Sequence, residues 1–387
     1  MSKETVAIYQ QEYLTISMTF IYRQLKGLDE EFKLLVMANR LNNVDIFPWE
    51  YIYSQPKRSF KEKAINKLYK LIKSKYAALS NQQYNYYKNV LINENVKLVH
   101  AHFGPSGLEI LPLVEELGIP LLVTFHGYDT SRLLQNKKYV RQLKELFDYA
   151  YIITVSKNMR DRLIQYGADP SRMKVHYIGA PLQDFVFHNR KALNEKAKNN
   201  EMIKFLQVSN FVEKKGHKYT IKAFREFLNV YPNSRLILAG DGPLRNSMED
   251  LCNELNLNNY VQFVGKVTKP EVIKLMKEAD VFLHHSVTAE NGDQEGIPTV
   301  LMEAMGTGLT VISTYHSGIP ELIIDGYNGF LVHEKDVTGY VEKLKHVLNT
   351  DNSIRKNAYN YVNKNFNIQI QNEELADIYR FVMNSEC

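Results

Sequence analysis

Cysteine is almost absent from this sequence, and its scarcity excludes a fold built on disulfides. Only Cys252 and Cys387 occur among 387 residues, whereas small secreted domains that need cross-links carry several. This composition indicates a reducing compartment. No run approaches eighteen apolar residues, and the N-terminus lacks a basic start followed by an apolar stretch. We therefore expect a cytoplasmic protein without a membrane span or a secretory signal.

Metal-ligand patterns are missing as well. The sequence has no Asp-x-Asp triplet and no His and Cys cluster at ligand spacing, so we expect no metal and no other cofactor. What is present is ordinary for a globular protein: 44% of the residues are hydrophobic and 24% are charged. A chain of this length exceeds what one core usually holds, so we expect two domains.

Positive charge is concentrated in residues 57–76, KRSFKEKAINKLYKLIKSKY. This segment has eight basic residues and one acid, a net +7, which leaves 5 − 7 = −2 for the rest of the chain. Its apolar residues recur every fourth position, as on one face of a helix. Such a helix could bind an anionic membrane or pack on its own domain, and we weigh these equally. Nucleic acid ranks last, because no finger, RNP or helix-turn-helix pattern accompanies the charge.

Short β-branched runs alternate with helical patterns in both halves of the chain, which predicts parallel α/β sheets. The polar segment 188–202 lies between the halves and reads as a linker. We expect an α/β fold of two Rossmann-like domains, residues 1–188 and 189–367, facing a central cleft. A closing amphipathic helix at about 368–387 would join the first domain. The predicted strands are 97–103, 120–127, 150–156 and 174–180, then IKFLQVSN, SRLILAGDG, VQFVGKV, DVFLHHS and LTVISTY.

The stretch EGIPTVLME carries two carboxylates, Glu295 and Glu303, around a predicted helix start. Pro298 suits the first helical position, so the N–H groups of Thr299 and Val300 would be free to bind a diphosphate. Glu303 would lie on the same helix face and Glu295 in the preceding loop. In the alternative reading, Glu295 caps the helix and Glu303 is solvated.

Three other loops carry candidate residues. Lys215 ends a loop after a predicted strand and could project a charge over the same cleft. The Gly-rich turn with Gly240 and Gly242 would allow a ligand to approach the backbone closely. His126 ends a strand of the first half, at the edge where substrates bind. In the alternative reading, His126 is a structural residue at a strand end whose hydrogen bonds are made within the protein.

These motifs together resemble retaining GT-B glycosyltransferases of family four. The resemblance covers about residues 96–335. Its second-domain motifs are VSNFVEKKGH, LAGDGPLR, FVGKV, DGYNGFLV and the long stretch from DVFLHHS to GIPELI, which includes the E-x7-E signature. VHAHFG and VTFHGYD are similar to the first domain of bacterial members that build exopolysaccharides, such as those of the colanic-acid type. The first 95 residues resemble the family only through SMTFI, where such enzymes have an acceptor-side loop.

The resemblance implies a role for each matching residue. Glu303 would hold the ribose of a nucleotide sugar, and Lys215 with the helix amides would hold its diphosphate. Glu295 would contact the sugar ring, and His126 would face the anomeric centre. The full set is His126, Lys215 and Glu295 as catalytic residues; Asn210, Gly240, Gly242, Arg245, Lys266, Val267, Gly296, Ile297, Pro298, Thr299, Val300 and Glu303 at the donor; and Ser17, Thr19 and Gly104 on the acceptor side.

Two positions depart from the family pattern. Asn210 stands where the family usually has an Arg, and a neutral amide cannot neutralise a phosphate. Arg245 and Lys266 are the nearest cations by motif that could replace it. The second departure is HHS at 284–286, where Pro-Ser is commoner.

We therefore interpret the sequence as a metal-independent retaining glycosyltransferase of the hexosyltransferase type. The expected donor is a UDP-sugar, with GDP as the other carrier considered. The expected acceptor is a glycan or a polyprenyl-diphosphate-linked oligosaccharide in exopolysaccharide synthesis, which with the basic segment suggests peripheral attachment to the inner face of the plasma membrane. The alternatives are a GT-B epimerase or phosphorylase, and a catalytically inactive glycosyltransferase-like binding scaffold, for which Asn210 is the supporting feature.

Overall fold

The computed structural model describes residues 3–13, 15, 18–55 and 76–385. The basic segment up to residue 75 and Ser17 lie outside these residues, so the predictions for them stay predictions. The chain divides into two compact units: unit 1 is Met1–Gly179 with Ile368–Cys387, and unit 2 is Ala180–Asn367. The division thus falls after Gly179 rather than after residue 188, and each unit is described by itself.

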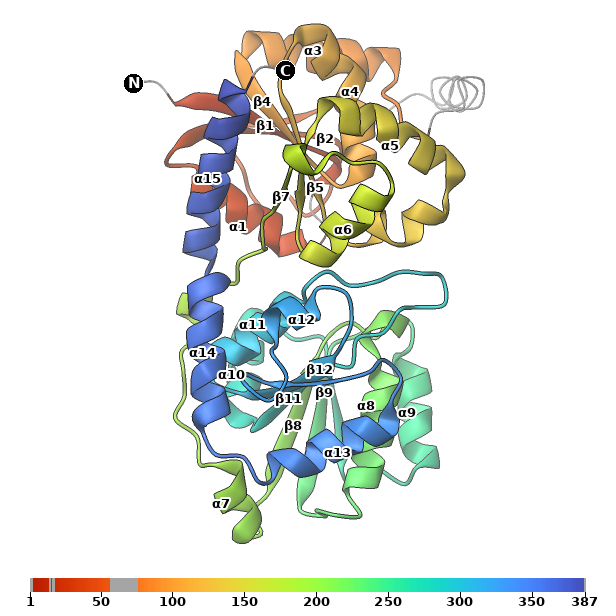
Figure 1. The fold of residues 1–387 in the computed structure, drawn as a ribbon, viewed down its shortest axis with the longest axis vertical. Helices are drawn as coiled ribbons and strands as arrows, with labels where there is room; N and C mark the ends of the chain where they lie inside the picture. Colours follow the sequence, from red (N-terminus) through yellow and green to blue (C-terminus); the bar gives the residue numbers. More distant parts are fainter. Residues whose placement is uncertain (1–2, 14, 16–17, 56–75, 386–387) are drawn as a thin grey trace. The chain divides into compact units, whose positions relative to one another are not determined.

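Unit 1 contains a parallel sheet with strand order β3-β2-β1-β4-β5-β6-β7 among the residues described (Figure 1). The sheet and the longer helices are β1 (Glu4–Tyr13), β2 (Phe32–Leu41), β3 (Ile52–Ser54), β4 (Val96–His102), β5 (Leu121–Phe125), β6 (Tyr151–Thr154), β7 (Met173–Val175), α1 (Thr19–Leu28), α3 (Asn81–Asn93), α4 (Gly104–Leu117), α5 (Lys137–Tyr149), α6 (Lys157–Gln165) and α15 (Ile368–Asn384).

Both faces of this sheet are buried, as expected for parallel strands. In β1, Ala7 and Tyr9 pack into a core shared with α3, α4 and α5. Val6 and Ile8 point to the other face, into a core shared with α1 and α15. Because alternate residues face opposite ways along a strand, one short apolar run serves both cores.

Unit 2 contains a second parallel sheet, with strand order β10-β9-β8-β11-β12-β13 in the described part of the chain. Its elements are α7 (Leu193–Lys198), β8 (Ile203–Val208), α8 (His217–Phe227), β9 (Ser234–Ala239), α9 (Arg245–Glu254), β10 (Val261–Gly265), α10 (Lys269–Glu278), β11 (Val281–Leu283), α11 (Thr299–Gly306), β12 (Thr310–Thr314), α12 (Ile319–Leu322), β13 (Phe330–Val332), α13 (Val337–Val347) and α14 (Ser353–Asn365).

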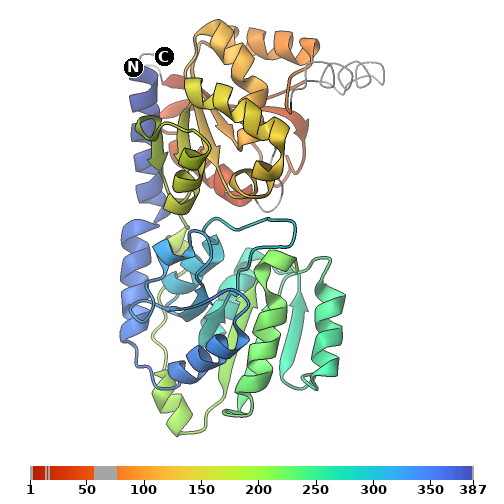
Figure 2. The ribbon, with the colours of Figure 1, turned by 45° about the vertical axis from the view of Figure 1, so that its right-hand side comes forward.

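The core of unit 2 also has two sides. Phe205 of β8 and Leu283 of β11 pack with Phe224 of α8 and Tyr340 of α13. Helices α10, α11 and α14 contact the sheet through β8 and β12 and are grouped together in Figures 1 and 2. The prediction of two Rossmann-like α/β domains is therefore confirmed.

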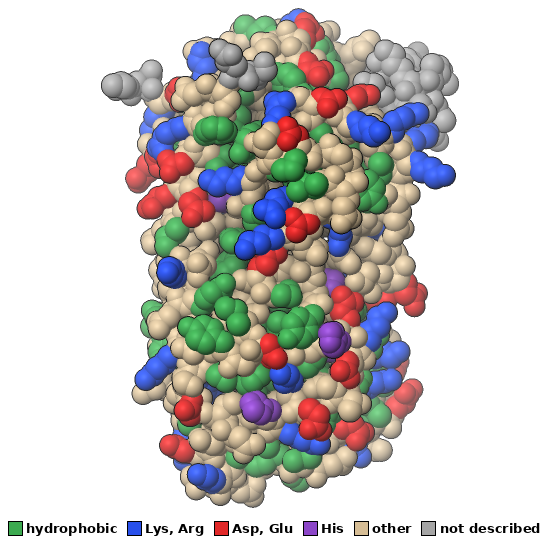
Figure 3. Space-filling model, in the orientation of Figure 1, with side chains coloured by type: hydrophobic (Ala, Val, Ile, Leu, Met, Phe, Trp, Pro, Cys, Tyr) green, Lys and Arg blue, Asp and Glu red, His purple; other side chains and the backbone are tan. Residues whose placement is uncertain are grey.

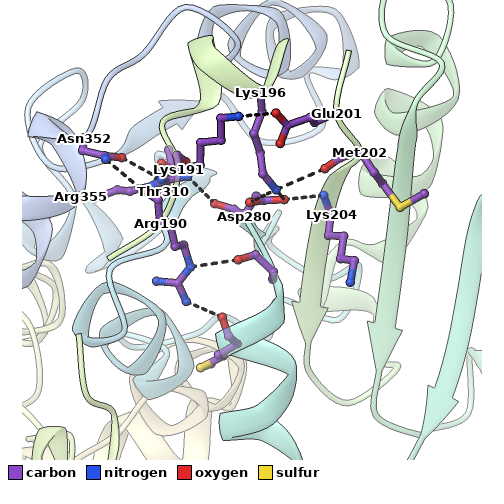
Figure 4. A network of polar contacts seen from close by, with 12 residues as sticks. Arg190, Lys191, Lys196, Glu201, Met202, Lys204, Asp280, Thr310, Asn352 and Arg355 are labelled. Atoms are coloured by element: carbon purple, nitrogen blue, oxygen red, sulfur yellow. Dashed lines mark hydrogen bonds and ion pairs between the residues drawn. The ribbon is translucent and has the colours of Figure 1, made fainter. Parts of the chain in front are cut away.

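The segment 188–202 is not the open linker that its polar composition predicted. It includes helix α7, and Arg190 donates to the carbonyls of Ala279 at 3.0 Å and Met276 at 2.6 Å. Lys196 forms an ion pair with Asp280 at 2.7 Å. Figure 4 shows these charged side chains converging on the start of β11. The charges therefore anchor the entry of the chain into unit 2.

Arg355 of α14 extends the same network (Figure 4). It is 1% exposed, and its guanidinium donates to Thr310 Oγ1 at 3.2 Å, the Lys191 carbonyl at 3.0 Å and Asn352 Oδ1 at 2.8 Å. A further bond reaches the Asp280 carbonyl at 3.2 Å. One buried cation thus connects α14, β12 and the entry segment through neutral acceptors.

On the side drawn in Figure 3, Lys and Arg side chains of the described residues alternate with Asp and Glu. None of the helices described here is both long and apolar enough to cross a bilayer.

Candidate functional site

The candidate site of unit 2 is built from three loops at the carboxyl edge of its sheet. These loops follow β8, β11 and β12, which are adjacent strands in the order β8-β11-β12. Adjacent parallel strands bring the loops that follow them to the same edge. The loops supply Lys215, Glu295 and His316 respectively.

Two lysines hold the Glu295 carboxylate. Lys215 Nζ lies 2.9 Å from Glu295 Oε2. Lys214 Nζ lies 3.5 Å from Glu295 Oε1 and 3.0 Å from Asp293 Oδ2. The structure thus brings the predicted residues Lys215 and Glu295 together. The part played by Lys214 was missed, although it stands directly before Lys215 in the same motif.

These lysines decide the charge of Glu295. Burial would raise the pKa of its carboxyl, because it removes water from the charged form, but Lys215 and Lys214 outweigh burial and lower the pKa to about 2. The side chain is 12% exposed, so solvent screens the attraction little. Burial works against the charged Lys214, but Glu295 and Asp293 raise its pKa. Glu295 and Lys214 are therefore both charged at neutral pH.

The backbone of Glu295 is held by a histidine that the sequence analysis missed. The N–H of Glu295 donates to His316 Nε2 at 3.1 Å. Because Nε2 accepts, Nδ1 of His316 carries the proton and donates to Glu334 Oε1 at 2.5 Å. Glu334 Oε2 accepts the N–H of Thr288 at 2.7 Å. The sequence feature that could have indicated His316 is the HSGIP turn, which follows a predicted strand.

A glycine makes the Lys215 loop possible. Gly216 has φ of +61°, and a Cβ at this position would lie 1.8 Å from the carbonyl oxygen of His285. No side chain fits there, so the loop can pass directly over the end of β11. Gln207 Nε2 donates to the Lys215 carbonyl at 2.9 Å and fixes the backbone that carries the lysine.

Helix α11 begins one residue later than predicted. Pro298 is its N-cap, with ψ of 119°, and Thr299 is the first helical residue. The N–H of Leu301 donates to the Pro298 carbonyl at 3.1 Å, and no hydrogen bond among the described residues uses the amides of Thr299 or Val300. Two donors thus remain at the positive end of the helix. Glu303 is 9% exposed, which excludes the reading of a solvated residue.

The Gly-rich turn crosses the loop after β8. A Cβ on Gly240 would lie 2.0 Å from the Ser209 carbonyl oxygen, and one on Gly242 would lie 2.7 Å from that of Phe211. The N–H of Phe211 donates to the Asp241 carbonyl at 3.0 Å. The close approach expected of these glycines is therefore made to the protein's own backbone.

The cations considered as replacements at Asn210 are paired elsewhere. Arg245 Nε donates at 2.9 Å to a glutamate one turn further along α9, and Lys266 lies 3.9 Å from Asp241 with 85% of its side chain exposed. Asn210 is exposed and Val267 is half-buried. None of the described ion pairs connects Arg245 or Lys266 to Glu295. Of the remaining predicted residues, Gly296 is half-buried and Ile297 is buried.

In unit 1, His126 follows β5 and belongs to a group of histidines. Its Nε2 lies 3.0 Å from Nδ1 of His102, and its ring lies 4.9 Å from Phe20 and 4.5 Å from Phe103. Burial lowers the pKa of His126 well below its usual value, and His102 adds to this. The imidazole is therefore neutral at pH 7. Its Nδ1 is buried and has no hydrogen-bond partner among the described residues.

Asp129 holds the loop of His126 to the start of α4. It accepts the N–H of His126 at 3.0 Å and that of Gly104 at 3.0 Å. A Cβ on Gly104 would lie 2.1 Å from the Tyr139 hydroxyl. Of the predicted acceptor-side residues, Gly104 is thus tied to His126, and Thr19 is the first residue of α1.

Both halves of the chain match families of glycosyltransferases. The family described as glycosyl transferases group 1 matches residues 189–365, and glycosyltransferase family 4 matches residues 37–184. No group of three or more His, Cys, Asp or Glu residues in the described ranges is placed to hold a metal ion.

Relatives and solved structures agree with this match. The chain is 31% identical to a putative colanic acid biosynthesis glycosyltransferase of Salmonella typhimurium, over 73% of this chain and 70% of that protein. The corresponding protein of Escherichia coli is 33% identical over 72% and 69%. HepE of Anabaena, in a crystal structure with UDP and glucose, has a TM-score of 0.77 at 18% identity and covers 98% of this chain and 100% of its own. The chain is therefore a glycosyltransferase of the group 1 family and has the GT-B fold that its sequence predicts.

Proposed function

We propose that the protein is a retaining hexosyltransferase that takes a sugar from a UDP-sugar. The observation that carries this proposal is the cluster of Lys214, Lys215 and Glu295 directly before the start of α11. A diphosphate bound at the free amides of Thr299 and Val300 would lie close in sequence to Glu295, which both lysines hold, so the lysines could stabilise its charge. These groups supply the positive charge without a metal ion.

The roles of the other residues follow from this placement. The bond between the anomeric carbon and the diphosphate oxygen breaks, the acceptor hydroxyl oxygen bonds to the anomeric carbon, and the hydroxyl proton passes to the departing diphosphate. Lys215 exchanges Glu295 for the diphosphate as the leaving group gains charge. Glu295, freed on one oxygen, accepts a hydroxyl of the sugar, and Glu303 holds the ribose. His126, neutral and with Nδ1 unpartnered, is assigned to the reacting centre.

The proposed acceptor is a glycan or a lipid-linked oligosaccharide of a cell-surface polysaccharide. Support comes from two relatives in Escherichia coli: the colanic acid glycosyltransferase, and a galactosyltransferase named for a diphosphoundecaprenol-linked acceptor, 26% identical over 75% of this chain and 76% of that protein. Peripheral binding to an anionic membrane through residues 57–76 belongs to the same proposal. Failure to sediment with anionic liposomes at low salt would count against that binding.

Thermal stability in the presence of nucleotide sugars tests the donor. A ligand at a hundredfold its Kd should add about 2.7 kcal/mol to the free energy of unfolding, so the purified protein is heated with UDP-glucose, UDP-galactose, UDP-N-acetylglucosamine and GDP-mannose. The best donor is then supplied with an acceptor glycan. The proposal is supported if UDP is released only when the acceptor is present and if NMR shows that the product has the same anomeric configuration as the donor. Inversion of the anomer, or epimerisation without an acceptor, contradicts it.

A further inference from the structure

The unusual pair of histidines after β11 divides between the two faces of the unit 2 sheet. The ring of His285 lies 5.1 Å from that of Tyr219 in α8 and 4.8 Å from that of Tyr340 in α13. The ring of His284 is almost parallel to that of Phe282, 6.4 Å away. Because side chains alternate along an extended chain, His284 points to the opposite face, on which α11 packs.

His284 is buried without any hydrogen-bond partner. It is 0% exposed, and neither ring nitrogen is bonded to another of the described residues. Oε1 of Glu295 is also buried and has the Lys214 ammonium 3.5 Å away, but no hydrogen bond to another of the described residues. Buried polar groups in native proteins are nearly always bonded to protein or to ordered water, so an exception calls for an explanation such as a water or a bound ligand.

His284 and Glu295 act on each other. Burial lowers the pKa of His284 well below its usual value; Lys215 lowers it further, whereas Glu295 raises it, and His217 and His316 add smaller lowering contributions. His284 in turn lowers the pKa of Glu295. The imidazole is therefore neutral. Its residue directly precedes His285, over whose carbonyl oxygen the Lys215 loop passes at Gly216. A neutral imidazole offers one N–H donor and one lone pair, and a carboxylate oxygen only accepts.

This combination of one donor and two acceptors decides between the parts of a nucleotide sugar. Phosphate oxygens only accept, so they could satisfy the N–H of His284 but neither acceptor. Sugar hydroxyls both donate and accept. We infer that His284, together with the carboxylate of Glu295, hydrogen-bonds hydroxyl groups of the transferred sugar and so helps to select it. The inference rests on the proposed function, and His284 is the residue that it adds.

The test compares UDP with the UDP-sugar that the wild-type protein binds most tightly, using calorimetry. His284→Leu should weaken the UDP-sugar about three- to tenfold, the value of one hydrogen bond between neutral groups, and change UDP binding less than twofold. The melting temperature of the ligand-free variant should rise, because two unpartnered polar atoms are replaced by an apolar side chain. His284→Gln, which keeps one donor and one acceptor, should restore part of the sugar preference.

His285→Leu is the matched control. It removes a bond from the Lys335 N–H to His285 Nε2, 3.0 Å long, so the melting temperature should fall while the ratio of UDP-sugar to UDP affinity stays at the wild-type value. An unchanged ratio in His284→Leu, or an equal loss for UDP and UDP-sugar, would overturn the inference alone. Failure of the wild-type protein to bind any nucleotide sugar would overturn the proposed function as well.

Discussion

Single residues decide how the site carries charge before a donor is bound. Lys215 and Glu295 neutralise each other at 2.9 Å, while Lys214 divides its charge between Glu295 and Asp293. A bound diphosphate would compete for Lys215 and leave Lys214 to hold Glu295. The second lysine thus allows the first to be exchanged without leaving a buried carboxylate unpaired.

The depressed pKa of Glu295 predicts a pH-dependent contribution to stability. A carboxyl whose folded pKa is about 2 contributes stability above its unfolded pKa of roughly 4.3 and loses it as pH falls through the folded value. Glu295→Gln should therefore cost on the order of 2–3 kcal/mol at pH 7. Urea unfolding should show the difference from wild type shrinking from pH 4.5 towards 2. Glu254→Gln, at an exposed site, should match wild type at every pH, and a constant gap for Glu295→Gln would argue against the ion pairs.

Lys215 should matter more for turnover than for binding. Lys215→Met keeps much of the side-chain volume but removes the charge that would meet the leaving group, so kcat should fall about 10²- to 10³-fold. The KM for the UDP-sugar should change far less. Lys218→Met, on the exposed side of α8, is the control for steady-state kinetics. An equal fall in both variants, or a change in KM alone, would remove Lys215 from the reacting end.

Glu303, unlike Lys215, should matter more for binding of the donor than for turnover. Glu303→Ala removes a buried carboxylate assigned to the ribose, and hydrogen bonds to a charged group are worth about 1.5–3 kcal/mol. Calorimetry should show UDP and UDP-sugar weakened together, by roughly ten- to a hundredfold. Unchanged affinity for UDP would contradict the ribose assignment.

The sequence predicts the residues of the site better than their contacts. Lys215, Glu295 and Glu303 lie in motifs, and their loops converge because parallel strands end at one edge. His316 and His284 come from different loops, so their relation to Glu295 depends on tertiary contacts that no local pattern encodes. Pro298 was predicted to be the first helical residue but is the N-cap. The missing N–H of proline suits both positions, so the sequence does not distinguish them.

At the level of elements, buried charge stabilises the start of unit 2. Arg190, Lys196 and Arg355 connect the entry segment to the sheet and to α14. Polar composition indicated a linker because solvated linkers and anchored segments use the same residue types. Only the buried acceptors, many of them backbone carbonyls, distinguish the two cases.

Arg355→Met should be strongly destabilising. It leaves acceptors on Thr310, Asn352 and two backbone carbonyls without their donor. Because each buried acceptor left unsatisfied costs about 1–3 kcal/mol, we expect a loss of about 3–5 kcal/mol. Chemical unfolding monitored in unit 2 should show it. Arg160→Met removes an exposed pair with Asp161 and should cost less than about 1 kcal/mol. Equal effects would mean that Arg355 is not the connecting residue.

The strands β4–β6 and β8–β12 were predicted from their apolar runs. The first three strands, β1, β2 and β3, were not predicted, and polar residues interrupt the second half of β1. Gln10 is 2% exposed, so tertiary structure buries a side chain that composition assigns to the surface. β13 is only three residues long, too short for a periodic pattern.

At the level of the whole molecule, the chain passes between the units twice. It enters unit 2 at Ala180 and leaves it at Asn367, and the two passages lie side by side: the Ala180 N–H donates to the Phe366 carbonyl at 2.8 Å. A Cβ on Gly179 would lie 2.4 Å from Ile368 Cα. Helix α15 then returns to unit 1, where Tyr379 bonds His100 Nδ1 at 2.7 Å.

Removing α15 should therefore destabilise unit 1, most of which is far from α15 in sequence. Deletion of residues 368–387 uncovers the core that α15 shares with β1 and α1, so calorimetry should show the unit 1 transition lost or strongly lowered. The unit 2 transition should stay close to its wild-type temperature. Tyr379→Phe is the milder variant. It removes the hydrogen bond to His100 and should lower the free energy of unfolding of unit 1 by about 1 kcal/mol. Loss of both transitions in the deletion would contradict independent cores.

The return of α15 to unit 1 also sets an order of events on the ribosome. Residues 1–179 emerge before unit 2, but the part of their sheet that α15 covers stays exposed until residues 368–384 have been made. Unit 2 is complete in sequence before that and can fold while unit 1 waits. The first unit to be synthesised is therefore the last to be completed, and during that interval its exposed apolar face is the part of the nascent chain most in need of a chaperone.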